Sequence, residues 1–200
     1  MARSICTRCK RPQRVCFCHL LSSLENRWPV TLVQHIEESK HAIGTAKIAQ
    51  LSLKNCVTHI LNDNDKFTST DYLANSNNNS ASGILIYPGE NSINIEELEA
   101  LPPLPLIFID ASWRKSRKIF YNSPFLQSLP SCSFSLSQPS RYKIRKEPKP
   151  NYCSTLEAIV YMLAELEHEP EKYSNLLSTM DWMIDQQIKL MGEKNFRTNY

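Results

Sequence analysis

Glycine is scarce in this chain of 200 residues, which contains only Gly44, Gly83, Gly89 and Gly192. A Rossmann dinucleotide site needs closely spaced glycines, and so does a Walker A loop, because the backbone must approach the phosphates closely. Neither fingerprint can be written with these four positions. The sequence therefore excludes both nucleotide-binding loops, and any nucleotide-like cofactor must be held by other means.

Long apolar runs and a strong net charge are also missing. No apolar run approaches the roughly 18 residues of a membrane span, and basic residues interrupt the N-terminus where a signal peptide needs an apolar core. Charged residues make up 22% of the chain and hydrophobic residues 42%, which is ordinary for a soluble globular protein. The formal net charge is only +3, so partners must be inferred from local clusters. We expect a cytoplasmic protein without membrane association.

Cysteine, in contrast, is concentrated at the start of the chain. Four of the seven cysteines fall within the first 20 residues in a C-x2-C-x6-C-x-C spacing. Two close pairs of thiolates can complete a tetrahedral zinc site, and an odd cysteine count in a cytosolic chain argues against disulfides. An iron–sulfur centre or a redox pair is the competing interpretation, and His19 could replace one thiolate. The predicted ligands of this structural zinc are Cys6, Cys9, Cys16 and Cys18.

The predicted zinc knob, residues 1–24, is also basic. The cations between its cysteines are Arg8, Lys10, Arg11 and Arg14. They predict a positive surface that suits a phosphate backbone, although plain solubility explains them equally well. The three other cysteines stand alone and are expected to be small core residues.

Short apolar runs alternate with amphipathic segments through residues 25–200, which we expect to form the catalytic domain. The predicted strands are 30–33, 57–61, 83–87 and 106–109, with another possible at 134–136. The predicted helices are 46–54, 95–101, 113–121, 158–166 and 170–191, the first with Thr45 as N-cap. The polar stretch 62–82 is expected to be a surface loop or a short insertion. This alternation indicates an α/β fold with a mostly parallel sheet flanked by helices.

The clearest candidate site follows the strand 106–109. Asp110 ends this buried run, and Ala111-Ser112-Trp113 precede a basic segment. Ligands of open α/β sheets bind at the carboxyl ends of strands. Two other predicted strands end in Gln34-His35 and Tyr87-Pro88-Gly89, and these ends could converge with Asp110. The alternative is a strand end followed by a solvated charge run.

Two basic segments are candidates for contact with RNA. In the predicted helix 113–121, three cations share one face at positions i, i+3 and i+4 beside Trp113. The segment 140–148 interleaves further cations with Tyr142. Cations mixed with aromatic side chains are typical of RNA-binding surfaces, whereas the alternative is a solvated loop. The RNA-binding candidates are Arg114, Arg117, Lys118, Arg141, Arg145 and Lys146.

Four separated blocks of this sequence resemble the DTW-domain family of tRNA-uridine aminocarboxypropyltransferases. The blocks are the N-terminal cysteine pattern, Gly44-Thr45 following Gln34-His35, Asp110-Ala111-Ser112-Trp113, and 141–148 leading to 154–158. They cover nearly the full chain in order. The name-giving motif of the family has threonine where this chain has Ser112, a change that keeps the hydroxyl and loses a methyl group.

The resemblance implies an S-adenosylmethionine-dependent enzyme. Such an enzyme would transfer the 3-amino-3-carboxypropyl group to N3 of a uridine in the tRNA variable loop, tRNA position 47, giving acp3U and 5′-methylthioadenosine. The resemblance also implies a fold related to the knotted SPOUT transferases, in which loops at the carboxyl ends of strands hold the cofactor. The cofactor-binding candidates are then Gln34, His35, Gly44, Thr45, Tyr87, Pro88 and Gly89.

The implied reaction suggests roles for Asp110, Ser112 and Trp113 as catalytic residues. N3 of uridine is a weak nucleophile while it is protonated, so a general base is needed near it. Asp110 is the carboxylate best placed for this, and Trp113 would either stack on the target base or wall the cofactor. Two alternatives remain: a SPOUT-like RNA methyltransferase, and a non-catalytic zinc-ribbon RNA-binding protein in which Asp110 is structural. The sequence leaves the oligomeric state open.

Overall fold

The computed structural model describes residues 4–41, 43–75, 82–89, 92–134, 140–142, 153–192 and 196. Its centre is a five-stranded sheet in the order β2-β1-β4-β3-β5, and every neighbouring pair is parallel. The strands are β1 (Val30–His35), β2 (Cys56–Leu61), β3 (Ile84–Ile86), β4 (Leu106–Asp110) and β5 (Ser131–Cys132). The predicted α/β class and mostly parallel sheet are confirmed, while the knot stays a prediction.

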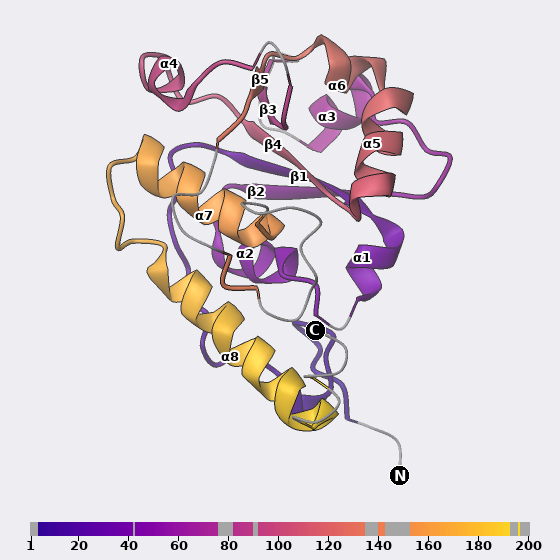
Figure 1. Cartoon of the computed structure of the whole chain (residues 1–200), viewed down its shortest axis with the longest axis vertical. Helices are drawn as coiled ribbons and strands as arrows, with labels where there is room; N and C mark the ends of the chain where they lie inside the picture. Colours follow the sequence, from indigo (N-terminus) through magenta and orange to yellow (C-terminus); the bar gives the residue numbers. More distant parts are fainter. Residues whose placement is uncertain are drawn as a thin grey trace.

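Helices cover both faces of the sheet (Figure 1). One face packs on α3 (Ser69–Asn75), α5 (Trp113–Asn122) and α6 (Pro124–Ser128). The other packs on α2 (Ala46–Ser52), α7 (Thr155–Leu166) and α8 (Ser174–Met191). Short helices complete the described elements: η1 (Gln13–Val15), α1 (Ile36–Lys40) and α4 (Ile95–Glu99).

The strand β4 shows why the apolar runs in this sequence are continuous rather than alternating. Leu106 and Phe108 belong to the apolar cluster under α2, α7 and α8, whereas Ile107 belongs to the cluster under α5 and α6. A strand covered on both faces needs apolar side chains at every position. The run therefore stops at Asp110, where the strand reaches the carboxyl edge of the sheet.

Several local predictions were wrong. The fifth strand is Ser131–Cys132 instead of 134–136: Phe134 lies outside every strand, and 135–136 lie outside the described residues. The last helix begins at Ser174, because residues after Pro170 form turns. The stretch 62–82 contains α3, since apolar Tyr72 packs into the core.

Capping also differs from the prediction at one helix. Thr45 occupies the N-cap position of α2, but its side chain makes no capping hydrogen bond. The capping box of α7 is present, with Ser154 accepting from the Glu157 amide while the Glu157 carboxylate accepts from the Ser154 amide. Within the described part of the chain, no helix is both long and apolar enough to cross a bilayer.

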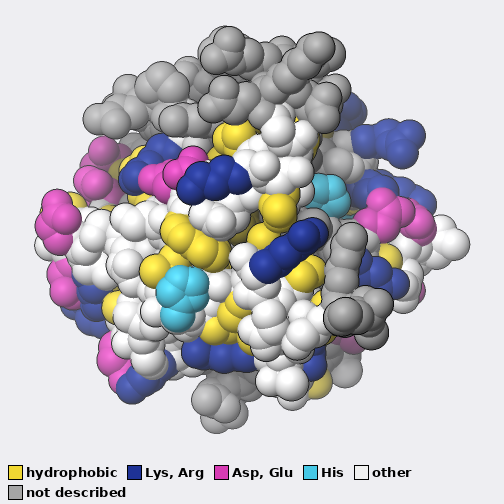
Figure 2. All heavy atoms as spheres, turned by 90° about the horizontal axis from the view of Figure 1, so that it is seen from below, with side chains coloured by type: hydrophobic (Ala, Val, Ile, Leu, Met, Phe, Trp, Pro, Cys, Tyr) yellow, Lys and Arg dark blue, Asp and Glu magenta, His cyan; other side chains and the backbone are white. Residues whose placement is uncertain are grey.

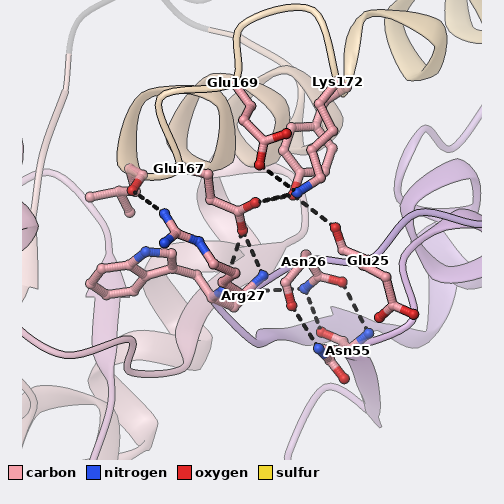
Figure 3. A network of polar contacts seen from close by, with 10 residues as sticks. Glu25, Asn26, Arg27, Asn55, Glu167, Glu169 and Lys172 are labelled. Atoms are coloured by element: carbon pink, nitrogen blue, oxygen red, sulfur yellow. Dashed lines mark hydrogen bonds and ion pairs between the residues drawn. The ribbon is translucent and has the colours of Figure 1, made fainter.

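A buried carboxylate fastens the end of α7 to the segment before β1 (Figure 3). The side chain of Glu167 is 0% exposed. It accepts from the Arg27 amide at 2.7 Å, from Lys172 Nζ at 2.7 Å and from Tyr173 Oη at 2.8 Å. Burial raises the pKa of Glu167, but these hydrogen bonds outweigh burial and the net pKa is lowered.

Next to Glu167, Asn26 and Asn55 connect the segments that lead into β1 and β2 (Figure 3). The Asn55 amide donates to Asn26 Oδ1 at 3.0 Å, and Asn55 Nδ2 donates to the Asn26 carbonyl. Asn26 Nδ2 in turn donates to the carbonyls of Trp28 and Asn55. These bonds align the segment before β1 with the turn before β2, so that Val30 pairs with Cys56.

Replacing the buried carboxylate by an amide, Glu167→Gln, is expected to destabilise the fold by about 3 kcal/mol at pH 7, because it removes the buried charge that pairs with the half-buried Lys172 and accepts from three further donors. The folded pKa of Glu167 lies below the unfolded value. Its stabilisation is therefore complete above the unfolded pKa and is lost as pH falls through the folded pKa. Urea unfolding between pH 7 and pH 3 should show a flatter acid limb for the variant.

Glu169→Gln is the matched control. Glu169 also pairs with Lys172 at 3.0 Å, but its side chain is 51% exposed, so the change should stay within about 0.5 kcal/mol. Equal stability of Glu167→Gln and wild type at pH 7 would contradict the role given to the buried carboxylate.

Candidate active site and metal centre

Asp110 lies at the carboxyl end of β4, in the middle of the sheet, and is only 8% exposed. Gln34 Nε2 donates to its Oδ2 at 2.7 Å, and Thr155 Oγ1 donates to its Oδ1 at 2.6 Å. The parallel register places Gln34 directly beside Asp110. These hydrogen bonds to both oxygens hold the Asp110 carboxylate in a fixed orientation.

A second amide extends this contact into helix α2. Gln50 Nε2 donates to Gln34 Oε1 at 3.4 Å, and this fixes the Gln34 amide with its nitrogen toward Asp110. The side chains of Gln50, Gln34, Asp110 and Thr155 thus join α2, β1, β4 and α7.

Thr155 is the site residue that sequence reasoning missed. It falls in the block 154–158 that carries the family resemblance, and it is the first residue of α7. Its position brings the α7 N-terminus to Asp110, where the helix dipole favours negative charge. No local pattern indicates this contact, because 45 positions separate the two residues.

His35, the last residue of β1, is buried and held on both ring nitrogens. Its Nδ1 accepts from the Glu37 amide at 3.2 Å, so Nε2 carries the proton and donates to Asp63 Oδ1 at 3.2 Å. Lys115 Nζ lies 3.4 Å from Nδ1 and forms an ion pair with Glu37. Hydrogen bonds from Lys115 and from His35 lower the pKa of Glu37 and of Asp63, respectively.

The segment after β3 reaches the same edge of the sheet. The ring of Tyr87 stacks on Phe120 of α5, with centroids 4.9 Å apart and planes at 13°. Pro88 and Gly89 follow and are exposed. Pro88 and Gly89 are therefore the exposed part of this segment, whereas Tyr87 is half-buried against α5.

The helix α5 begins directly after Asp110 (Figure 1). Ser112 is its N-cap residue, although its side chain makes no capping hydrogen bond, and Trp113 is half-buried in the first turn. The three cations predicted to share a face are all exposed: Arg114, Arg117 and Lys118. The fourth cation of the helix is turned toward the strand ends, where it pairs with Glu37.

The second basic segment is described only in part. Arg141 forms an ion pair with Asp181 of α8, and the Arg141 amide donates to the buried carboxylate of Glu157. The hydroxyl of Tyr142 donates to the Ile43 carbonyl at 2.9 Å. Arg145 and Lys146 lie outside the described residues.

Gly44 forms a tight turn between α1 and α2. Its amide donates to the His41 carbonyl at 3.1 Å, and a Cβ at this position would lie 3.1 Å from the Glu38 carbonyl oxygen. The close backbone approach favours glycine. Neither Gly44 nor Thr45 is brought to Asp110 by a direct hydrogen bond; the described connection runs through Gln50 and Gln34.

The four predicted metal ligands gather in one cluster. The sulfurs of Cys6 and Cys18 lie 3.8 Å apart, as do those of Cys9 and Cys16, and all four lie within 4.8 Å of one another. A tetrahedral zinc with Zn–S bonds of about 2.3 Å separates its sulfurs by about 3.8 Å. The cluster therefore fits zinc in ligand type, number and spacing.

The pKa values of the thiols in the cluster are shifted in opposite directions. Backbone hydrogen bonds from Cys9 and Arg8 lower the pKa of Cys6 to about 6, whereas burial raises the pKa of Cys18 to about 12. A divalent cation at the centre would favour the thiolate form of every ligand. His19, the possible substitute ligand, instead packs its ring edge-on against Trp182 at 5.2 Å.

One cation of the knob does not belong to its surface. Arg8, Lys10 and Arg14 are exposed, but Arg11 is 8% exposed, and its guanidinium lies over the ring of Phe17. The prediction of a positive surface was therefore wrong for Arg11. Seen from below, the molecule shows Lys and Arg side chains spread among apolar and uncharged polar ones (Figure 2).

The carboxyl edge of a parallel sheet is where ligands of such folds bind, and here it carries a buried carboxylate joined to three elements. Fold and site together define an α/β protein with a candidate ligand site and a separate cluster of four cysteines that could hold a metal ion.

Comparison with known proteins shows the family. The DTW domain matches residues 3–188, so the chain belongs to the DTW-domain family. The chain is 29% identical over 195 residues to a Drosophila melanogaster protein named tRNA-uridine aminocarboxypropyltransferase 2, covering 93% of this chain and 76% of that protein. A mouse protein of the same name is 30% identical, and the chain covers 64% of its length. An Arabidopsis thaliana tRNA-uridine aminocarboxypropyltransferase A is 26% identical over 218 residues, covering 94% of this chain and 83% of that protein.

The purified chain is expected to hold about one zinc per molecule, and Cys6→Ser should lose it because a tetrahedral site needs all four ligands. Elemental analysis measures the metal, and thermal unfolding should show a destabilised variant, since structural zinc contributes folding free energy. Cys56→Ser, outside the cluster, is the control and should keep its zinc. An absence of metal in wild type, or unchanged metal in Cys6→Ser, would refute the assignment.

The hydrogen bond from Thr155 to Asp110 is testable through stability. Thr155→Val removes a hydroxyl that donates to a buried carboxylate and should cost about 2 kcal/mol in urea unfolding. Thr155→Ser keeps the donor and should cost much less. In an Asp110→Ala background the valine change should have little further effect, because its partner is gone. Additive costs would mean that the two side chains do not interact.

Proposed function

We propose that this protein is a tRNA-uridine aminocarboxypropyltransferase that uses S-adenosylmethionine as the donor. It transfers the 3-amino-3-carboxypropyl group to N3 of a variable-loop uridine, tRNA position 47, giving acp3U. The observation that carries the proposal is the family match over residues 3–188. The names of the fly, mouse and plant relatives support the same reaction.

The reaction needs a general base near N3, S-adenosylmethionine bound in a bent conformation, and a uridine that is exposed from the tRNA. In the proposed step, the N3 proton passes to a base, N3 attacks the Cγ of the methionine moiety, and the Cγ–S bond breaks. The electron pair of that bond stays on sulfur, which turns the sulfonium into the thioether of 5′-methylthioadenosine. Placement of Cγ, rather than the methyl carbon, in line with N3 decides the product.

Asp110 is the proposed base. Its carboxylate is the described acidic group at the centre of the carboxyl edge, and donors on both oxygens hold it in place. A fixed carboxylate can accept the N3 proton without reorganising. Trp113 and Ser112, next in the chain, are proposed to wall the site, and the backbone of Tyr87-Pro88-Gly89 is proposed to contact the donor.

The tRNA would approach along α5. Arg114, Arg117 and Lys118 are exposed on the helix that starts at the site, so they can contact phosphates while the uridine reaches Asp110. The ion pair of Arg141 with Asp181 makes Arg141 the weaker candidate among the described cations.

Mixing the protein, S-adenosylmethionine and tRNA should release 5′-methylthioadenosine, which chromatography measures, and the tRNA should gain the mass of one aminocarboxypropyl group. Asp110→Asn should lower the rate by about 10²- to 10⁴-fold, the usual contribution of a general base. Binding of tRNA by this variant should persist.

Each other outcome selects a different function. Release of S-adenosylhomocysteine with a methylated nucleoside would identify a methyltransferase. Binding of tRNA without any product would leave a zinc-containing RNA-binding protein in which Asp110 joins strands and helix only. Both results contradict the proposal.

A further inference from the structure

The knob and the turn before α2 are joined by a buried cation. Arg11 Nη2 donates to the Gly44 carbonyl at 3.0 Å, and the guanidinium carbon lies 4.9 Å from the centroid of the Phe17 ring. Arg11 is 8% exposed and Phe17 is fully buried. Within the described part of the chain, the guanidinium contacts a carbonyl and an aromatic face and forms no ion pair with a carboxylate.

The cysteine cluster fixes both sides of this contact. The Cys6 amide donates to the Arg11 carbonyl at 2.7 Å, and the Lys10 amide donates to the Cys6 carbonyl at 3.0 Å. Lys10 has a φ of 62°, so the chain reverses tightly just before Arg11. Phe17 lies between Cys16 and Cys18 in the sequence. A metal that draws the four sulfurs together therefore also orients the guanidinium and the ring beneath it.

The turn at Gly44, which accepts the hydrogen bond from Arg11, leads to the candidate site. The Gly44 carbonyl accepts from Arg11, and the neighbouring Ile43 carbonyl accepts from Tyr142. Helix α2 begins two residues later, and its Gln50 donates to Gln34, which donates to Asp110. The turn is thus held from two sides at the start of the helix that orients the amide beside Asp110.

Folding alone does not require this arrangement. Burying a guanidinium costs free energy, and here the cysteine cluster lies close enough to favour its charge. Residues that break such a local rule are expected at functional positions. The planar fork of arginine lets its guanidinium carbon lie over a ring while a nitrogen at its edge donates to a carbonyl, whereas lysine offers a point charge on a flexible stem.

We propose that Arg11 is a positioning residue that couples the cysteine cluster to the Gly44 turn. Metal binding at the knob then sets the conformation of Gly44 and Thr45, which are candidate cofactor-binding residues. Arg11 acts through the turn and touches neither substrate. The consequence for S-adenosylmethionine rests on the proposed function, whereas the coupling of metal to turn does not.

The test compares Arg11→Met with wild type by amide hydrogen exchange. The reporters are the amides of Gly44 and Ile48, which donate to the carbonyls of His41 and Thr45. Both amides should exchange about tenfold faster in the variant, because the Gly44 carbonyl loses the charged donor that holds the turn. The zinc content should stay at one per chain. S-adenosylmethionine should bind about tenfold more weakly by calorimetry.

Arg8→Met is the matched control. Arg8 belongs to the same knob and donates to the Leu51 carbonyl at the far end of α2, but it is exposed. It should leave the exchange of Gly44 and the affinity for S-adenosylmethionine unchanged. If Arg11→Met fails to fold, Arg11→Lys, which keeps the charge but loses the fork, serves in its place.

Removal of the metal by a chelator provides a second test of the coupling. Removing zinc from wild type should speed exchange at Gly44 to the same extent as Arg11→Met, and chelation of the variant should add little there. Unchanged Gly44 exchange in Arg11→Met, or equal effects of the Arg8 and Arg11 variants, would overturn the coupling. Failure of wild type to bind S-adenosylmethionine would refute the proposed function, but the exchange results would still decide the coupling.

Discussion

The carboxylate of Asp110 is the point at which the sheet and the helices on one of its faces are fastened together. Its two oxygens accept from Gln34 on the neighbouring strand and from Thr155 at the start of α7. This is possible because β1 and β4 are parallel, so that Gln34 near the end of β1 lies beside Asp110 at the end of β4. The site is therefore a product of topology: strands that ran antiparallel would place Gln34 at the opposite edge.

Buried polar groups hold the rest of the chain around that edge. Glu157 at the start of α7 accepts from Ser140 and from the Arg141 amide, and Glu167 at the end of the same helix accepts from the segment before β1. Each of these carboxylates has several donors, which is the condition under which a buried charge is tolerated. The helix α7 is thereby fixed at both ends, and Thr155 is held where Asp110 needs it.

Much of the fold could be predicted from the sequence, because a sheet covered by helices on both faces requires apolar side chains in its strands. The predicted strands 30–33, 57–61, 83–87 and 106–109 correspond to β1, β2, β3 and β4, with differences of one or two residues at their ends. The fifth strand was misplaced because two residues at a sheet edge carry too little pattern. Helices α1 and α6 are five residues each, too short for a helical period to be visible. The division into residues 1–24 and 25–200 stays a prediction, although Cys6, Cys9 and Phe17 share an apolar cluster with α7 and α8.

The sequence by itself determined the chemistry available: four closely spaced thiols, a carboxylate at the end of a buried strand, and cations one helical turn apart. These are local properties, set by spacing along the chain. Only the tertiary structure decided how those groups are used, because burial and partners depend on distant segments. In the tertiary structure Arg11 is buried, Lys115 pairs with Glu37, and Thr155 contacts Asp110 although 45 positions separate them. Such contacts arise when separate elements pack, and no local pattern records them.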